Sequence, residues 1–358
     1  MRLRHFFAAL CLTVGASAVL AQDLPQDLPR GAGLPLAVQT GVAVAELHSF
    51  DENEGTFEAT IDLRLRWRDA RLARADGNLA APPLTLRDEA AVQQLAKMWS
   101  PNIVLANQVG EVLQNMQGLQ IFPDGTVENL RRLRAVFKTD VNFDKFPFDR
   151  QKLTFEIVVN DRSVNEMILR TLQADIDFSK VSNSVQLAGW NAGLVDLSSV
   201  PLAGWYSSSN ARVIASVDVT RQPGLAVASI YIPLIASLLI PLLALWFNRM
   251  EEGVFQVETF ELVNIIIGGF FAVIALNFTV LSSYPALADG NNSVMQLLAL
   301  NYCTLAMGLL ISIVFGRFNV LSNLFGVMVQ EQAYTLLMWA LPLGLAATVA
   351  AIIGAAYV

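Results

Sequence analysis

The first half of the chain alternates between hydrophobic and polar positions over several long stretches. In the run 55–69 the odd positions from Phe57 to Trp67 are hydrophobic, and the even positions from Glu58 to Arg68 are polar or charged. A period of two is typical of a strand with one buried face. Similar alternation occurs in the stretches LPLAVQTGVAVAELHSF, RLRAVFKTDVNF, KLTFEIVV and ARVIASVDVTR. Turn signals such as Pro123-Asp124-Gly125 separate these runs, so residues 22–224 are predicted to form an all-β, Ig-like antiparallel sandwich.

The second half replaces this alternation with four apolar segments. They cover residues 225–246, 260–282, 294–316 and 334–358, and each is close to the roughly 20 residues that a helix needs to cross a bilayer. Over the whole chain only 15% of the residues are charged, against roughly 25% in soluble domains. Residues 225–358 are therefore predicted to form a four-helix transmembrane bundle.

The N-terminus has the three parts of a secretory signal peptide. Arg2 and Arg4 form a basic start, residues 6–20 an apolar core, and Ala21 ends a small-residue cleavage site. An uncleaved anchor helix is the alternative, but this apolar stretch is short for a membrane span. We therefore predict that residues 1–21 are a signal peptide and that the sandwich is exported.

Composition excludes several classes of function. Beyond residue 21 the chain keeps one cysteine, Cys303, and one histidine, His48, which are too few for a metal cluster or a Cys/His nucleophile pair. The sequence has no G-x-S-x-G, H-E-x-x-H or phosphate-binding glycine motif, so we expect neither an enzyme nor a cofactor. A net charge of −7 argues against nucleic acid as a partner.

The second apolar segment carries a polar stripe. Steps of three and four residues from its start connect acidic, polar and small side chains, which should face protein or water instead of lipid. The stripe allows two interpretations: a helix–helix interface built from small residues, or the lining of a pore. In a pore, Glu261 would form an acidic ring that attracts cations, and Phe271 an apolar constriction that gates by dewetting. The stripe consists of Glu261, Asn264, Gly268, Phe271, Ala272, Ala275, Thr279 and Ser282.

The stretch FDKFPFDRQKLTF (143–155) places two phenylalanines in what should be a solvated turn. Together with LRLRWRDARLA (63–73), KMWSPNIVLAN (97–107), PDGTV (123–127), Pro233, Trp246 and Pro285, it resembles the pentameric ligand-gated ion channels, the Cys-loop receptor superfamily. The short connection after the third apolar segment resembles the bacterial branch of that family. The resemblance extends from about Leu36 to Val358.

This resemblance implies a role for the FPFD loop. Phe146, Pro147 and Phe148 should lie at the base of the sandwich, where both phenylalanines are buried against the linker that follows the second membrane helix. Animal relatives close the loop with a disulfide, whereas the equivalent positions here are Thr139 and Leu153, so we expect packing alone to hold it.

The same resemblance predicts a charged cluster at the junction between the two domains, formed by Glu52, Asp149 and Arg221. A buried arginine needs carboxylate partners, which supports this grouping over three solvated surface charges. Agonist-driven movement of the sandwich would pass through this cluster to Pro285 and widen the ring of Phe271 side chains.

Family membership further implies five identical subunits around a pore. The register counted from Pro285 places Glu261 at an inner acidic ring, Asn264 at a narrow polar ring and Phe271 at a central hydrophobic gate. Monovalent cations are the expected permeant ions.

The agonist is not determined by the sequence. Trp205 and Tyr206 are candidate ligand contacts, but the other expected walls of an aromatic cage, 102–110 and 158–164, contain no aromatic residue, so local packing explains them equally well. Proton-gated relatives carry a glutamate and a histidine where this chain has Gly55 and Val273. Other carboxylates, Glu46, Asp51, Glu52 and Glu54, would sense protons only if they were buried.

We therefore predict a homopentameric, cation-selective channel in a bacterial inner membrane, gated by a small molecule or by protons, with its sandwich outside. The alternative is a non-conducting membrane-tethered sensor that signals through a partner. A transporter fits poorly, because four helices leave no room for inverted repeats.

Overall fold

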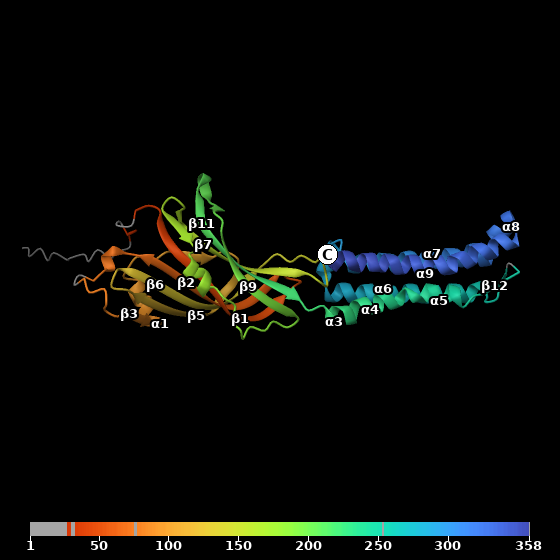
Figure 1. Cartoon of the computed structure of the whole chain (residues 1–358), viewed down its shortest axis with the longest axis horizontal. Coiled ribbons are helices and arrows are strands. Elements are labelled where there is room, and N and C mark those ends of the chain that lie inside the picture. The colour runs from red at the N-terminus through yellow and green to blue at the C-terminus, as the bar shows by residue number, and fades with distance from the viewer. Residues whose placement is uncertain (1–26, 30–32, 75–76, 253, 358) are drawn as a thin grey trace, which may run out of the picture.

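The computed structural model describes residues 27–29, 33–74, 77–252 and 254–357, so the predicted signal peptide lies outside the described residues. The chain forms an elongated molecule with a β-sandwich at one end and four long helices at the other (Figure 1). The two parts meet where the last sandwich strand runs into the first membrane helix.

The sandwich consists of a six-stranded and a five-stranded sheet. The first sheet has the order β3-β5-β6-β2-β1-β8, and the second the order β10-β11-β7-β4, with β9 pairing to β11. The strands of the first sheet are β1 (Leu36–Asp51), β2 (Thr56–Arg68), β3 (Leu84–Arg87), β5 (Gln108–Ile121), β6 (Thr126–Lys138) and β8 (Met167–Arg170). Those of the second are β4 (Ile103–Leu105), β7 (Arg150–Ser163), β9 (Trp190–Ser199), β10 (Leu202–Ala203) and β11 (Ser209–Arg221). Short helices α1 (Asp88–Leu95) and α2 (Gln173–Phe178) lie in the connections.

The sandwich core is built from the hydrophobic positions of the alternating runs. Phe57, Phe137 and Phe155 come from three strands and are fully buried, with ring centroids 4.9–5.5 Å apart. Trp67 and Trp99 pack edge to face at 5.9 Å. Trp67, Trp99 and Trp190 are all at most 5% exposed and belong to this core.

One predicted strand ends early. The run RLRAVFKTDVNF alternates to Phe143, but β6 ends at Lys138. Lys138 pairs with Thr56, the first residue of β2, so no partner strand continues beyond that point. Phe143 instead packs at the domain junction beside Phe146, with ring centroids 6.2 Å apart.

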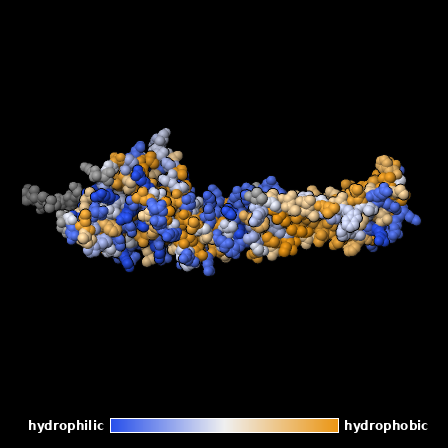
Figure 2. Space-filling view, viewed as in Figure 1, coloured by the Kyte–Doolittle hydropathy of each residue, from blue (hydrophilic) through white to orange (hydrophobic). Residues whose placement is uncertain are grey.

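Within the described residues, four helices are long and apolar enough to span a membrane: Gly224–Trp246, Thr259–Ser283, Ser293–Arg317 and Val327–Tyr357. The first is divided into α3 (Gly224–Ala226), a π-helical turn (Val227–Tyr231), α4 (Ile232–Ser237) and α5 (Leu239–Trp246). The others are α6 (Thr259–Ser283), α7 (Ser293–Ile311, continued as a π-helix to Arg317) and α9 (Val327–Tyr357). The surface over these helices is mostly hydrophobic, whereas that of the sandwich is mixed (Figure 2).

Two connections complete the helical domain. A short hairpin, β12 (Met250–Glu251) and β13 (Val254–Phe255), joins α5 to α6, and α8 (Val320–Phe325) joins α7 to α9. The fourth helix begins at Val327, seven residues before the predicted start at Tyr334. Its extra turns carry Gln330, Glu331 and Gln332, which hydropathy alone assigns to a loop.

Candidate functional site

The face of α6 that carries the predicted polar stripe is open to solvent in the single chain. Phe271 is 69% exposed, and the other seven residues of the stripe are exposed as well. The opposite face contains Leu262, Ile266 and Val273, which are at most 1% exposed and pack in the helical core. The stripe therefore lies within the face of this helix that the subunit itself leaves uncovered, together with flanking residues such as Ile274 and Phe278.

The close helix–helix contact uses a different glycine from the one in the stripe. A Cβ at Gly269 would lie 2.7 Å from Leu305 Cδ2 and 3.1 Å from Ile240 Cγ2, so α6 depends on glycine there to approach its neighbours. A Cβ at Gly268 would meet nothing within 4 Å. Within the chain, the small-residue packing interpretation thus applies to Gly269 and not to the stripe.

The structure brings Glu52, Asp149 and Arg221 together at the domain junction. Arg221 donates from Nε to Asp149 Oδ1 at 2.6 Å and from Nη2 to Glu52 Oε2 at 2.6 Å. The side chains of Arg221, Asp149 and Glu52 are 6%, 2% and 15% exposed. These three residues form the charge cluster of the junction.

Aromatic rings cover the guanidinium of Arg221. Its carbon lies 4.2 Å from the ring centroid of Trp190 and 4.8 Å from that of Phe146. Burial on its own would lower the pKa of Arg221, but hydrogen bonds to Asp149 and Glu52 and their charges outweigh it and leave the pKa raised. The charge is therefore retained in a largely dry environment.

The FPFD loop binds the helices through its first phenylalanine. Phe146 is 0% exposed, and its ring lies 6.5 Å from that of Tyr231 and 5.7 Å from that of Tyr284. Its carbonyl oxygen accepts hydrogen bonds from Tyr231 Oη and Ser293 Oγ, both at 2.7 Å. The loop is thus attached to the first and third membrane helices as well as to the linker after α6, and Tyr231 and Ser293 carried no signal in the sequence.

Phe148 occupies a more open position than predicted. Pro147 is buried, but Phe148 is only half-buried and meets Tyr357 edge to face, with ring centroids 5.4 Å apart. Tyr357 lies at the end of α9, so the expectation that both phenylalanines are fully buried against the α6 linker is wrong for Phe148. Tyr357 is itself 74% exposed, so this contact covers Phe148 only in part.

Hydrogen bonds, and not packing alone, hold the loop closed. Thr139 Oγ1 donates to the carbonyl oxygen of Lys152 at 2.5 Å, next to the position where animal relatives carry the second cysteine. Gln151 exchanges hydrogen bonds with the backbone of Asn142 at 2.6 and 2.9 Å and donates to Asp149 Oδ2 at 2.6 Å. The expectation of closure by packing alone is corrected by these contacts.

The first hairpin touches the outer end of α6. Asn53, at the tip between β1 and β2, donates from Nδ2 to the carbonyl oxygen of Ser283 at 3.3 Å. Pro285 follows immediately and opens the short 3-10 helix Pro285–Asp289. The hairpin that contains Glu52 therefore makes a direct contact with α6, the helix that carries the stripe.

The connection that leads into β11 projects from the sandwich (Figure 1), and Trp205 and Tyr206 lie in this projection, in a 3-10 helix (Trp205–Ser207) between β10 and β11. They are 83% and 97% exposed, and their ring centroids are 6.4 Å apart. Tyr206 and Ser207 have positive φ values of 52° and 62°. Local packing within the subunit does not account for such exposure, and their role as ligand contacts stays a prediction.

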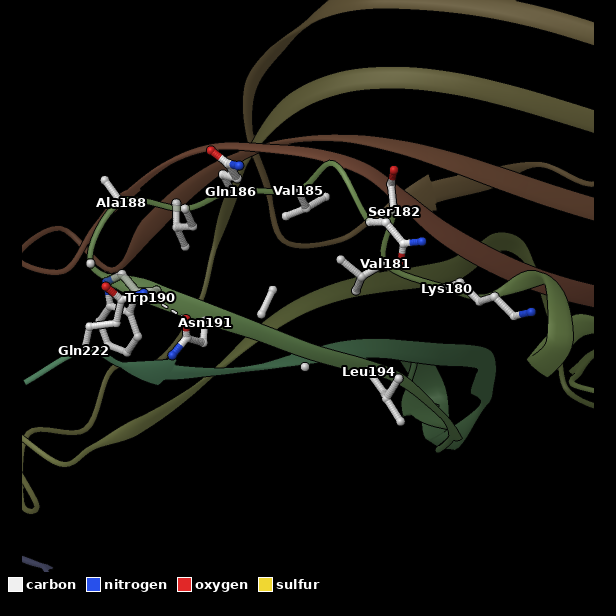
Figure 3. Close-up of a pocket in the computed structure, with 15 residues that line it drawn as sticks. Lys180, Val181, Ser182, Val185, Gln186, Ala188, Trp190, Asn191, Leu194 and Gln222 are labelled. Atoms are coloured by element: carbon white, nitrogen blue, oxygen red, sulfur yellow. Dashed lines mark hydrogen bonds between the residues drawn. The ribbon is translucent and has the colours of Figure 1, made fainter.

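A cavity of about 980 Å³ lies between the segment 180–188 and β9. Trp190, Asn191 and Gln222 gather at one end and Lys180 at the other (Figure 3). Gln222 Nε2 donates to Asn191 Oδ1 at 2.8 Å. Since Trp190 lines this cavity and also contacts Arg221, the cavity adjoins the charge cluster.

Comparison with known proteins agrees with this architecture. Residues 25–223 match the family model of the neurotransmitter-gated ion-channel ligand binding domain. The chain is 26% identical over 273 residues to a proton-gated ion channel of Gloeobacter violaceus. The aligned region covers 75% of this chain and 69% of that protein. It is also 23% identical to the mouse gamma-aminobutyric acid receptor subunit theta and 22% identical to the rat glycine receptor subunit beta, over 62% and 65% of this chain.

The matches to the two animal receptors span 34% and 48% of their length. The family match covers more than half of this chain and includes the whole sandwich. The sandwich, the four spanning helices and the single cysteine of the described chain, Cys303, all fit this assignment. The chain belongs to the pentameric ligand-gated ion channels, a family of multi-pass membrane receptors and not of enzymes.

Proposed function

We propose that five identical copies of this chain form a cation-selective channel whose pore is lined by α6. The observation that carries the proposal is the uncovered stripe from Glu261 to Ser282. A stripe with a carboxylate at one end should not face lipid, and no other part of the described chain covers it. A central aqueous pore is the environment that satisfies it.

The proposal gives individual positions of the stripe separate functions. Five Glu261 carboxylates at the inner mouth would concentrate monovalent cations and repel anions. Asn264 would form a polar ring one turn further along the helix. Phe271 would form an apolar ring, and ions would pass it only when the ring is wide enough for the pore to be filled with water. Ile267 and Ile274, which flank the stripe and are 42% and 52% exposed, would pack against neighbouring subunits.

Gating would pass through the domain junction. Movement of the sandwich would act on the charge cluster and on Phe146, which is bonded to Tyr231 and Ser293. The Asn53 contact and the Pro285 linker would then tilt α6 and change the width of the Phe271 ring. Trp205 and Tyr206, exposed on their projection, are the candidate contacts for a small-molecule agonist.

Protons are the second candidate agonist. A relative is described as a proton-gated ion channel, although this chain has Gly55 and Val273 where the family's proton-gated members carry a glutamate and a histidine. With the predicted signal peptide, the channel would reside in a bacterial inner membrane with the sandwich outside.

The first experiment is to record current from the purified protein in a planar bilayer while the pH on the sandwich side is stepped from about 8 to about 4. This interval covers roughly the range in which carboxylates and histidine titrate. In wild type we expect a reversible cation current. In Glu261→Gln we expect the reversal potential to shift toward the value of a pore that does not discriminate between cations and anions. The matched control is Glu331→Gln, which removes a carboxylate near the same end of the bundle, on α9. An unchanged reversal potential in Glu261→Gln would contradict the acidic ring.

A silent bilayer at every pH would direct the search to small-molecule agonists, tested together with Trp205→Ala. If no ligand evokes current from a protein that cross-linking shows to be pentameric, the non-conducting sensor is the better explanation.

A further inference from the structure

Asn301 is a polar residue of α7 that is enclosed within the helical domain, where it is 0% exposed. Its Nδ2 donates to the carbonyl oxygen of Leu234 at 3.0 Å and, within its own helix, to that of Leu297 at 2.9 Å. Its Oδ1 accepts from Ser237 Oγ at 2.6 Å. A buried amide without hydrogen bonds would be costly in this apolar environment. Leu234 and Ser237 belong to the first membrane helix, so this amide joins α7 to α4.

The first membrane helix is interrupted at Leu238, between α4 and α5. The amide of Leu238 donates to the carbonyl oxygen of Ile235, three residues back, at 3.2 Å, whereas a regular α-helix would use that of Leu234, four residues back. Pro241 lies in the next turn and accounts for the break, because proline has no N–H to donate and its ring clashes with the carbonyl four residues before it. The carbonyl of Leu234 thus loses its usual backbone partner, and the amide of Asn301 replaces it.

The residues directly after the break pack closely against the two neighbouring helices. A Cβ at Gly269 of α6 would lie 3.1 Å from Ile240 Cγ2, and a Cβ at Gly308 of α7 would lie 3.1 Å from Pro241 Cβ. Interiors packed this closely transmit a displacement instead of absorbing it. Gly269 lies two residues before Phe271 on α6. A change in the path of the first membrane helix at the break would therefore displace α6 beside Phe271.

We propose that Asn301 is a positioning residue, which stabilises the break at Leu238 and through it sets the position of α6. In a second arrangement the amide of Leu238 would return to the carbonyl of Leu234 and release Asn301. The hydroxyl of Ser237 has one hydrogen and two acceptors within reach, Asn301 Oδ1 at 2.6 Å and the carbonyl oxygen of Leu234 at 2.8 Å, so it can donate in both arrangements. The consequence for ion flow rests on the proposed function of α6, whereas the stabilisation of the break does not.

The test is a double-mutant cycle on the full-length protein in detergent, with thermal unfolding measured for wild type, Asn301→Leu, Pro241→Ala and the double variant. Asn301→Leu should lower Tm by about 3–6 °C, because it leaves the carbonyl of Leu234 without a partner. In the Pro241→Ala background the same substitution should cost less than roughly half as much, since position 241 then has an N–H and the helix can continue through Leu238. Thr304→Val is the matched control, because Thr304 is buried on α7 but its hydroxyl donates to carbonyls of α7 itself, and its effect should be equal in both backgrounds.

Hydrogen–deuterium exchange provides the readout that a general loss of stability would not produce. In Asn301→Leu we expect exchange to rise roughly tenfold in the peptides that contain Leu238 and Gly269, and to stay unchanged in the rest of the helical domain. Should Asn301→Leu fail to fold, Ser237→Ala takes its place in the cycle, because it removes a single hydrogen bond of the same amide.

The proposal is overturned if Asn301→Leu costs the same in both backgrounds, or if exchange rises evenly over all four helices. Neither measurement depends on ion flow. A failure of the pore proposal would therefore leave a coupled cycle standing, and an uncoupled cycle would leave the pore proposal standing.

Discussion

The geometry of the charge cluster predicts how strongly each of its three residues contributes to the stability of the protein. Asp149→Asn keeps the shape of the side chain but removes the charge that receives two hydrogen bonds from Arg221, at 2.6 and 3.1 Å. Asp149 is 2% exposed, so water cannot replace the lost interaction. Glu52→Gln removes the other carboxylate, whose side chain is 15% exposed and can be partly rehydrated.

The expected magnitudes follow from burial. Breaking a buried ion pair costs about 3–5 kcal/mol, and since Glu52 still compensates Arg221 in Asp149→Asn, we expect about 3 kcal/mol for that variant. Glu52→Gln should cost roughly 1.5 kcal/mol, the lower limit for a charged hydrogen bond. Arg221→Met leaves two carboxylates facing each other without a cation and should be the most destabilising of the three.

The assay is thermal unfolding of the full-length protein in detergent. A loss of 3 kcal/mol corresponds to a decrease in Tm of roughly 6–12 °C for a domain of this size. Glu54→Gln is the control, because Glu54 lies two residues from Glu52 in the same hairpin but is exposed, and we expect a change within about 0.5 kcal/mol. If Asp149→Asn proves no more destabilising than Glu52→Gln, or matches Glu54→Gln, the assignment of the buried pair as the dominant contact is refuted.

Three further substitutions test the packing of the junction and of α6. Gly269→Ala places a Cβ 2.7 Å from Leu305 Cδ2 and should cost about 1–3 kcal/mol by thermal unfolding, whereas Gly268→Ala should leave unfolding unchanged and alter only single-channel conductance. Thr139→Val removes the hydrogen bond to Lys152 and should cost about 1–2 kcal/mol in denaturant unfolding, with Thr139→Ser as the variant that restores it. Gly55→Ala should lower Tm by at least roughly 2 °C, because Gly55 has a φ of 63° and a Cβ would lie 2.7 Å from the carbonyl oxygen of Thr139; no loss in Tm would contradict that geometry.

The strands and the membrane helices could be predicted because each is set by a local pattern. Alternation identified the buried face of β2 residue by residue, from Phe57 to Trp67. The polar stripe of α6 was visible because lipid excludes such a face, and the structure leaves it uncovered. The grouping of Glu52, Asp149 and Arg221 came from the family resemblance, supported by the need of a buried arginine for carboxylates.

Other features depend on partners that are distant in the sequence. β6 ends at Lys138 because β2 begins at Thr56, which no pattern within β6 reveals. The first turns of α9 are polar and helical because Gln330 is buried and accepts from the Ser322 amide at 2.7 Å, a contact that hydropathy cannot register. Tyr231 and Ser293 are 62 residues apart in the sequence, and in the fold their hydroxyl groups meet each other and the carbonyl of Phe146.

The two contacts between the sandwich and the helices differ enough in strength to have different roles in the proposed gating. Phe146 is fully buried and its carbonyl accepts two hydrogen bonds of 2.7 Å, so separating it from the helices would expose an aromatic ring and leave polar groups unpaired. Asn53 reaches Ser283 through one exposed hydrogen bond of 3.3 Å, which contributes at most about 1 kcal/mol. We therefore expect the FPFD loop to act as the fixed pivot on α7 and the first membrane helix, while the hairpin that carries Glu52 changes its contact with α6. Because Glu52 is held by Arg221, and Arg221 by the Asp149 carboxylate of the pivot loop, we expect the charge cluster to keep the two domains joined while the hairpin moves.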